Sequence, residues 1–107
     1  MTVDDGDQLV RVLAALANPH RLRILAAVAS GRIHVSRLAR EVSLSRPLVH
    51  MHLQRLEAAG LVTGHLELSE EGKALKFFEV TPFDLRLDAA AIAAAAQTLT
   101  PDSGGKQ

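Results

Sequence analysis

No cysteine occurs among the 107 residues of this sequence. Without a thiol, the chain forms no disulfide bond, gives a metal ion no thiolate ligand and has no cysteine nucleophile. Small secreted domains that depend on disulfide bonds for their stability are therefore excluded. The absence fits the reducing interior of a cell, and we expect a cytoplasmic protein.

A hydrophobic stretch long enough to cross a membrane is also missing. The apolar run at residues 89–96 is far shorter than the roughly 20 residues that a membrane-spanning helix needs. The first residues include Asp4, Asp5 and Asp7, whereas a secretory signal begins with basic residues. We therefore expect neither a membrane partner nor a signal peptide.

Sequence patterns typical of enzymes are absent as well. The sequence contains no glycine-rich phosphate loop, no Ser-His-acid arrangement and no pair of carboxylates typical of a catalytic cleft. A chain of 107 residues also leaves little room for a substrate pocket within one subunit. We therefore expect a protein that is not an enzyme and that requires no cofactor.

What the sequence does contain is a basic segment inside a neutral chain. Hydrophobic residues make up 48% of the chain, enough for one folded domain, and the net charge is zero. Between Gln8 and Leu56, however, there are eight arginines and a single acid, Glu41, so this segment carries +7 and the remainder −7. Such segregation indicates a local face that binds anions such as nucleic acid.

The first two helices are predicted from apolar periodicity and from their caps. Leucines and valines recur at helical spacing over residues 5–17. Asn18 and Pro19 are a cap and a first-turn proline that start a second helix, and Gly31 ends it. The residues predicted to face inwards from the second helix are Leu22, Leu25, Ala26, Val28 and Ala29.

A helix-turn-helix is predicted next. Residues 35–42 form a short helix, Ser43 and Leu44 make a tight turn, and Ser45 caps a further helix that ends at Gly60. The inward positions of the two helices are Val35, Leu38, Ala39, Val42, Val49, Leu53 and Leu56.

The second part of the chain changes its pattern. Alternating residues between 61 and 81 predict a β-hairpin, and Asp88 caps an alanine-rich helix over residues 89–99. The predicted fold class is mainly α with a β-hairpin wing (α+β): a winged helix-turn-helix of four helices, a hairpin and a fifth helix. We expect the domain at residues 8–99, between a flexible acidic N-terminus at 1–7 and a flexible tail at 100–107.

Three stretches of the chain together resemble the ArsR/SmtB family of bacterial winged-helix repressors. The first is residues 16–25, LANPHRLRIL. The second is Leu38 and Ala39 with the recognition pattern Ser45, Val49, His52, Leu53, Leu56 and residues 59–62. The third is Gly72 and Lys73 before an alternating strand. The resemblance covers residues 9–99 and implies a homodimer that represses transcription by binding an inverted-repeat operator in double-stranded DNA.

The resemblance also implies where two subunits meet and which residues meet DNA. Family members dimerise through their first and last helices, which here carry Leu9, Val12, Leu13, Leu16, Ile92, Ala95, Ala96 and Leu99. A recognition helix lies in the major groove of DNA with its N-terminal residues against the base edges. The predicted DNA-binding residues are Arg37, Arg40, Ser45, Arg46, Pro47, His50, Met51, Gln54, Arg55, Lys73 and Lys76.

These residue types suit different parts of DNA. Arginine pairs with a guanine edge and glutamine with adenine, which fits Arg46 and Gln54. His50 can donate to a base or a phosphate. Pro47 and Met51 offer apolar contacts, for example to a thymine methyl group. The serine, the remaining arginines and the wing lysines suit phosphates, although the acids of the wing tip, residues 70 and 71, repel them.

A metal effector is one further expectation. Some relatives bind metal through two cysteines at the start of the third helix, where this chain has His34 and Ser36. Others use Asp and His ligands on the last helix, which here is flanked by Asp84 and Asp88 but contains no histidine. We therefore predict His34, with Asp84 or Asp88, as candidate ligands for nickel or zinc; the alternative role for His34 is a helix cap.

Other readings of the sequence stay open. The inducer could instead be a partner protein or a small molecule, or there could be none. The alternative to a DNA-binding protein is a winged-helix module that pairs with other proteins, for which weak retention on heparin would be expected.

Overall fold

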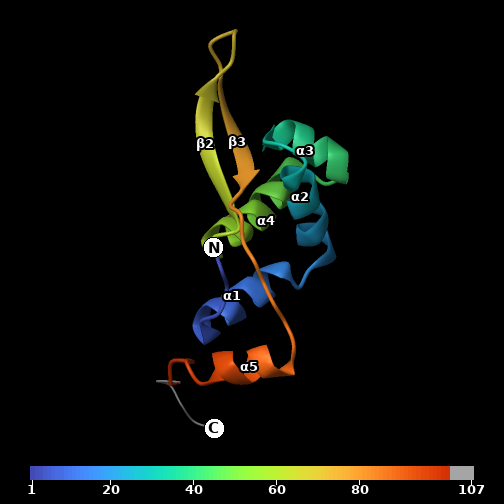
Figure 1. Ribbon diagram of the computed structural model, residues 1–107. Helices are drawn as coiled ribbons and strands as arrows, with labels where there is room; N and C mark the ends of the chain where they lie inside the picture. The colour runs from blue at the N-terminus through green and yellow to red at the C-terminus, as the bar shows by residue number, and fades with distance from the viewer. Residues whose placement is uncertain (102–107) are drawn as a thin grey trace.

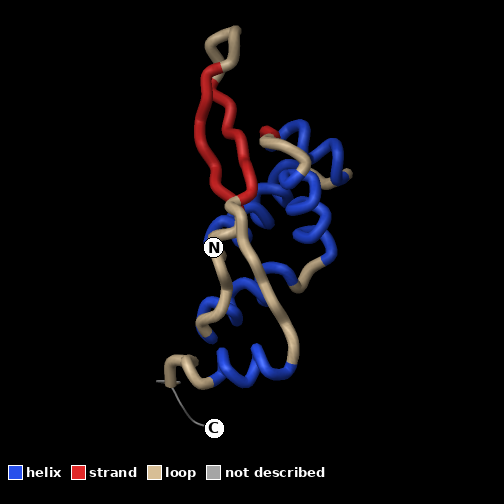
Figure 2. Tube along the Cα trace, in the orientation of Figure 1, coloured by secondary structure: helices blue, strands red, loops and turns tan. Residues whose placement is uncertain are grey.

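The computed structural model of the protein describes residues 1–101, which form five helices and three strands (Figure 1). In chain order these are α1 (Gly6–Leu16), α2 (Pro19–Ala29), β1 (Ile33–His34), α3 (Val35–Val42), α4 (Arg46–Ala58), β2 (Val62–Leu68), β3 (Ala74–Val80) and α5 (Ala89–Ala96). The long β2–β3 hairpin projects beyond the helices (Figure 2). The winged helix-turn-helix fold predicted from the sequence is confirmed.

The predicted caps start three of the helices. The side chains of Asn18, Ser45 and Asp88 each accept hydrogen bonds from amides in the first turn of α2, α4 and α5. Pro19 is in the first turn of α2, where an amide hydrogen would have no acceptor within the helix. Local chemistry alone therefore fixes where these helices begin.

The turn between α3 and α4 depends on one left-handed residue. Ser43 has φ 58° and ψ 44°, and within residues 1–101 it is the single non-glycine residue with a positive φ. This conformation lets the amides of Ser43 and Leu44 bond back to the carbonyls of Arg40 and Ala39 at 3.4 and 3.1 Å. The turn is thereby closed in two residues, which sets α4 across α3.

The hairpin belongs to a sheet that the sequence analysis did not predict in full. Within the described residues the strand order is β1-β3-β2, and both pairs are antiparallel. Ile33 and His34 of β1 lie opposite Phe78 and Phe77 of β3. The added strand ties the base of the hairpin to the start of α3, so the position of the wing is fixed relative to the helix-turn-helix.

The core lies between α1–α4 and the base of the sheet. Its fully buried members are Val12, Ile24, Val28, Leu38, Val49, Leu53, Leu56, Leu61 and Val62. The inward faces predicted for α3 and α4 are confirmed. For α2 the prediction was right for Val28, which is buried, and for Leu25, which packs against the core. It was wrong for Leu22, Ala26 and Ala29, which are exposed, and it missed the fully buried Ile24. The buried face of α2 is therefore rotated relative to the predicted one.

Both ends of the described chain make contacts with the rest of the domain. Thr2 pairs with Asp84 in a parallel bridge, and Val3 is buried. At the other end, Thr100 donates hydrogen bonds from its amide and its hydroxyl to the carboxylate of Asp7. Residues of both segments that the sequence analysis set outside 8–99 therefore contact the domain, and the flexibility expected of these segments stays a prediction. Residues 102–107 of the predicted tail lie outside the described residues.

The molecule is elongated, with the wing at one end and α5 at the other (Figure 1). Its radius of gyration is 16.3 Å, compared with about 13 Å for a compact domain of 100 residues. Within the described part of the chain, no single helix is long and apolar enough to cross a membrane; only α1 and α2 together, bent by 96°, reach the required length and composition.

Candidate nucleic-acid interface

Helix α4 presents one polar face to solvent. The side chains predicted to meet DNA from this helix, Arg46, Pro47, His50, Met51, Gln54 and Arg55, are all exposed. Val49, His52, Leu53 and Leu56 face the core instead. The sequence analysis missed Leu48, which is 44% exposed at the start of the same helix. A leucine beside Pro47 enlarges the apolar surface that the first turn of α4 can offer to a thymine methyl group.

Arg46 lies where α3, α4 and the wing converge. Its Nη1 donates to Oγ of Ser36 at the start of α3, at 3.2 Å. Arg46 and His50 line a hollow of about 170 Å³ that also contacts His34 and Lys76. The structure therefore brings together predicted residues from the recognition helix and from the wing, at the N-terminal end of α4 where base contacts are made.

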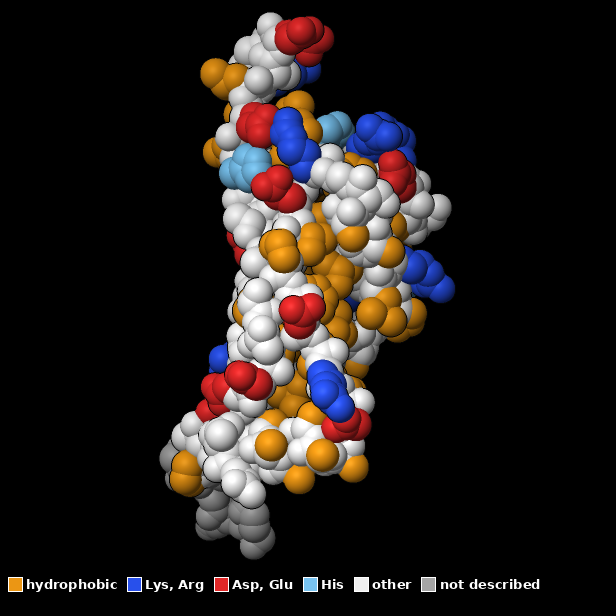
Figure 3. All heavy atoms as spheres, in the orientation of Figure 1, with side chains coloured by type: hydrophobic (Ala, Val, Ile, Leu, Met, Phe, Trp, Pro, Cys, Tyr) orange, Lys and Arg blue, Asp and Glu red, His pale blue; other side chains and the backbone are white. Residues whose placement is uncertain are grey.

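The arginines of α3 are less alike than their sequence suggests. Arg40 and Arg46 line a second hollow of about 390 Å³ on the outer side of the helix-turn-helix. Arg37 is exposed but pairs with Glu41 one turn further on, with Nε and Oε2 3.1 Å apart. In the space-filling view, basic side chains gather over α3 (Figure 3). Arg40 is thus the freer of the two cations for a phosphate.

Arg55 lies apart from the other predicted DNA contacts. It is nine residues after Arg46 on α4, which corresponds to about 13 Å along the helix axis. Its neighbours there are Arg11 and Arg21, with which it lines a cleft between α1, α2 and α4. The contact of Arg55 with a phosphate stays a prediction, and the structure does not bring Arg55 close to Arg46.

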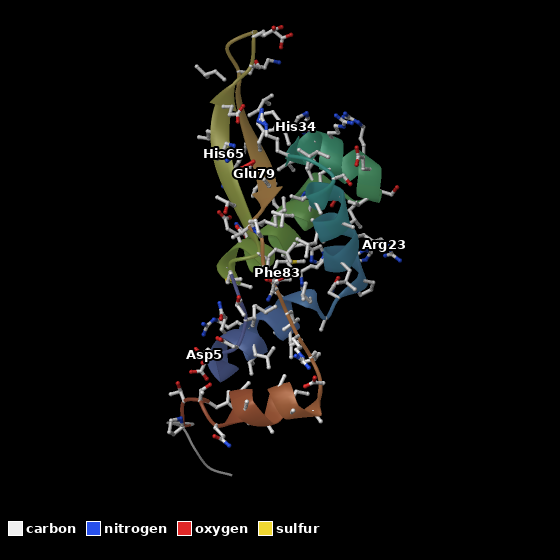
Figure 4. The ribbon with its side chains drawn as sticks, in the orientation of Figure 1. Asp5, Arg23, His34, His65, Glu79 and Phe83 are labelled. Carbon is white, nitrogen blue, oxygen red and sulfur yellow. The ribbon has the colours of Figure 1, made fainter. Side chains whose placement is uncertain are left out.

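A charged cluster links the outer half of the wing to the segment that precedes β1. Arg32 donates from both Nη atoms to the two carboxylate oxygens of Glu67, each at 2.7 Å, and its guanidinium lies 4.2 Å from the ring centre of Phe77. His65 Nε2 is 3.1 Å from Glu67 Oε2. Figure 4 labels His65 on β2 and His34 at the start of α3. A bidentate pair of this kind restricts the angle of the wing relative to α3.

The wing lysines differ in their surroundings. The Nζ of Lys76 lies 5.4 Å from the ring centre of Phe78 and faces the hollow beside Arg46. Lys73 is exposed in the loop between β2 and β3, next to the acidic pair at residues 70 and 71. Lys76 is therefore better placed than Lys73 to act together with the recognition helix.

His52 joins the recognition helix to the rest of the domain. It is 5% exposed, and its Nδ1 accepts a hydrogen bond from Nη1 of Arg21 at 3.2 Å. Its ring centre lies 5.7 Å from that of His20. Burial lowers the pKa of His52, and the positive charge of Arg21 and the proximity of His20 and Arg55 lower it further. The imidazole is therefore neutral at physiological pH.

This histidine makes stability depend on pH. Because the pKa of His52 is lowered from 6.5 on folding, the unfolded state takes up its proton first as pH falls. We expect the free energy of unfolding to be constant above about pH 7 and to decrease as the pH falls through 6.5 towards the lower folded-state pKa. Urea unfolding followed by circular dichroism between about pH 7.5 and pH 5 measures this slope.

A variant isolates the contribution of His52. In His52→Gln the amide oxygen can still accept from Arg21 but does not titrate, so the slope in this window should flatten. Asp7 does not interfere, because hydrogen bonds from Thr100 lower the pKa of its carboxyl group below 3.8. Equal slopes for the wild-type protein and His52→Gln would show that another group titrates.

The predicted dimer residues fall into two groups. Five of them keep exposed surface: Leu13, Leu16, Ile92, Ala96 and Leu99. Leu9 of α1 and Ala95 of α5 are almost fully buried. The prediction for Val12 was wrong, because its side chain is fully buried in its own subunit and has no surface left for a partner. An entirely apolar groove of about 210 Å³ runs between α1 and α5, and apolar side chains cover α5 in Figure 3.

The candidate metal ligands are not brought together within one subunit. Among the described residues, no three His, Asp or Glu side chains lie close enough to hold a metal ion. Nδ1 of His34 accepts from the amide of Arg37 at 3.4 Å and so caps α3, which is the alternative role considered for it. Asp88 caps α5, and the backbone of Asp84 pairs with residues 1–3.

Comparison with known proteins places this arrangement among regulators. The sequence pattern described as bacterial regulatory protein, arsR family, matches residues 18–63. The chain is 36% identical over 80 residues to the uncharacterized HTH-type transcriptional regulator MJ0229 of Methanocaldococcus jannaschii, a match that covers 75% of this chain and 83% of the relative. It is 37% identical over 60 residues to the nodulation protein NolR of Rhizobium meliloti, covering 56% of this chain and about half, 49%, of NolR.

A solved structure agrees with these sequence matches. The homodimeric winged helix-turn-helix DNA-binding domain Mb0332 of Mycobacterium bovis superimposes with a TM-score of 0.62 and 31% sequence identity. The match covers 69% of this chain and 64% of that one. The sequence matches are thus accompanied by a likeness in fold.

Proposed function

This chain belongs to the ArsR family of bacterial regulatory proteins and is a DNA-binding transcriptional regulator, and from that premise we propose that it is a homodimeric repressor of an inverted-repeat operator. Each subunit inserts the first turns of α4 into a major groove. Repression follows from steric occlusion of the promoter. Arg46 reads a base, while Arg40 and Lys76 hold the backbone on either side of it.

The single observation that carries the proposal is the exposed, acid-poor start of α4. Arg46, Pro47, His50 and Met51 are all exposed there, and the residues that line the adjoining hollows add Arg40 and Lys76 but no acid within the described chain. Cations grouped around the N-terminal turns of a recognition helix match the arrangement of phosphates beside a major groove. Affinity for DNA should therefore fall steeply as the salt concentration rises.

The apolar surface of α1 and α5 supports the homodimer. Every residue of α5 is alanine or isoleucine, and yet only Ala95 is buried within the subunit among residues 89–96. A helix that is apolar on all sides is normally covered. A second copy of the same helices is the covering surface we propose, and the similar domain from Mycobacterium bovis is described as homodimeric. Two recognition helices would then enter successive major grooves about 34–36 Å apart.

The first test is fluorescence anisotropy with labelled DNA. A duplex from the promoter of the protein's own gene is compared with a scrambled duplex at one salt concentration, with and without nickel or zinc. A preference for the promoter supports the repressor; equal weak binding to both duplexes contradicts it and favours a protein-pairing module. A preference that nickel or zinc removes would support a metal effector bound through His34 with Asp84 or Asp88 of either subunit.

Arg46→Ala tests how the operator is read. We expect binding to weaken by roughly 1–3 kcal/mol and discrimination at one base pair to relax. Arg86→Ala is the matched control, because Arg86 is highly exposed and pairs with Asp88 at the far end of the molecule. Anisotropy titrations against duplexes with single base-pair changes measure both effects. Uniform weakening on every duplex would instead assign Arg46 to a phosphate.

A further inference from the structure

A cleft between α1, α2 and α4 lies apart from the start of α4 and is lined by only one of the predicted DNA contacts, Arg55. It has a volume of about 260 Å³ and is lined by Arg11, Ala14, Ala15, Arg21, Arg55, Ala58 and Ala59. Alanines leave its walls open, and its charged groups within residues 1–101 are all arginines. The hollow is therefore a concave surface of a single charge sign.

The arginines of this cleft are not neutralised by acids. Within the part of the chain that the structure describes, Arg11, Arg21 and Arg55 take part in no ion pair. The positive charge of Arg11 helps to lower the pKa of Asp7, but the hydrogen bonds that this carboxylate accepts come from Thr100. Converging cations without a counter-charge concentrate anions in a cleft.

Arg21 is held in a fixed orientation and still has donors to spare. Its Nε donates to the carbonyl of Ala15 at 2.5 Å, and its Nη2 to that of Ala14 at 3.3 Å. Its Nη1 donates to Nδ1 of His52. A guanidinium has five N–H donors in a rigid plane, so after these three bonds one N–H remains on each Nη atom. These two N–H groups are available to the oxygens of a phosphate or carboxylate.

We propose that this cleft binds a small anionic effector whose phosphate or carboxylate group is held by Arg11, Arg21 and Arg55. A water molecule takes up about 30 Å³ in the liquid, so a cleft of about 260 Å³ admits a molecule of the size of pyrophosphate. Binding to the cleft is independent of any DNA. The effect of the bound anion on operator affinity rests on the proposed repressor function.

The hydrogen bond between Arg21 and His52 connects the cleft to the recognition helix. His52 is on the buried side of α4, and Arg46 is on the same helix. An anion on the remaining N–H groups of Arg21 draws the guanidinium into the cleft and so weakens the bond from its Nη1 to Nδ1 of His52. The effector therefore shifts α4 relative to α1 and α2 and lowers the affinity for the operator.

The experiment uses pyrophosphate as the probe and the arginine Nε–H signals in ¹H–¹⁵N NMR spectra as the readout. We expect saturable shifts of the Arg11, Arg21 and Arg55 signals, together with a change in the ¹⁵N signal of His52. Arg11→Gln should raise the dissociation constant at least about tenfold, which corresponds to about 1.4 kcal/mol. Arg23→Gln is the matched control, because Arg23 is exposed on the outer side of α2 (Figure 4) and should leave the constant unchanged.

The possible results distinguish a failure of the proposed anion site from a failure of the proposed repressor function. Shifts that do not saturate, or equal losses in Arg11→Gln and Arg23→Gln, would overturn the site, because they indicate a diffuse ion atmosphere. Loss of operator binding in folded Arg11→Gln without pyrophosphate would also overturn it, since the cleft would then contact the DNA backbone. Saturable binding by a protein that prefers no duplex would leave the site standing and contradict the proposed function.

Discussion

Replacing Gly6 with alanine is expected to separate α5 from α1 and to weaken the proposed dimer. A Cβ atom at this position would overlap the carbonyl oxygen of Ala95 and would lie 2.9 and 3.0 Å from side-chain carbons of Leu99. Alanine is ordinarily a better helix former than glycine, so the close approach of the two helices reverses the usual sign. Overpacking costs roughly 1–3 kcal/mol in each subunit, so the variant should dissociate at protein concentrations at which the wild-type dimer persists. Sedimentation velocity over a range of concentrations measures this change.

A second variant identifies the atom responsible. Gly6→Ala combined with Leu99→Ala removes the side-chain overlap but leaves the overlap with the backbone oxygen of Ala95. We therefore expect the double variant to stay as dissociated as Gly6→Ala. If Leu99→Ala restored the dimer, the side chain would be the obstacle and the backbone of α5 would have room to move. A dimer unaffected by Gly6→Ala would show that α1 and α5 do not approach this closely.

Replacing Leu53 with alanine is expected to remove a large part of the stability of the domain. Leu53 is on α4, is 1% exposed and belongs to the core beneath the recognition face. Truncating a buried leucine costs about 2–5 kcal/mol through lost burial and the cavity left behind. Domains of this size have a total stability of about 5–15 kcal/mol. Urea unfolding followed by circular dichroism should show a correspondingly lower midpoint, with operator binding reduced only in proportion to the unfolded fraction.

Leu48→Ala is the matched control on the same helix. Leu48 is 44% exposed, so its truncation leaves little cavity and should change stability by less than about 0.5 kcal/mol. Its effect should appear instead in DNA binding, because it extends the apolar surface beside Pro47. Similar losses of stability in Leu48→Ala and Leu53→Ala would contradict the orientation of α4.

The helices and the exposed face of α4 were predictable because their signals are local. Asn18 with Pro19, Ser45 and Asp88 mark helix starts by chemistry that acts within one turn. The turn at Ser43 is equally local. Once α4 is placed and its apolar residues are turned inwards, the exposure of Arg46 and its neighbours follows from the helical period.

The features that were missed depend on contacts between distant parts of the chain. A strand as short as β1 has no pattern of its own, and it exists because Ile33 meets Phe78 across the sheet. The pairing of Thr2 with Asp84 is of the same kind. Sequence patterns record which residues avoid water, but they do not record which partner covers them.

The buried face of α2 shows a further limit. Leu22, Leu25, Ile24 and Val28 are all apolar, so periodicity permits more than one inward face. The structure selects Ile24 and Val28 because α2 must pack against α3, α4 and β3 at once. The same rotation turns Arg21 towards His52 and the cleft. The cleft therefore depends on a choice of helix face that α2 alone does not determine.

The contact between α1 and α5 has a consequence for how the chain folds. Gly6 and Thr98 are bonded although 92 positions separate them, and Asp7 and Thr100 are separated by 93. Closing such a large loop early carries an entropic penalty without any local contacts to offset it. The helix-turn-helix and the hairpin, built from short-range contacts, therefore form first, and the two ends of the chain join last. If that joining also creates the surface for the second subunit, the final step of folding is bimolecular and speeds up with protein concentration.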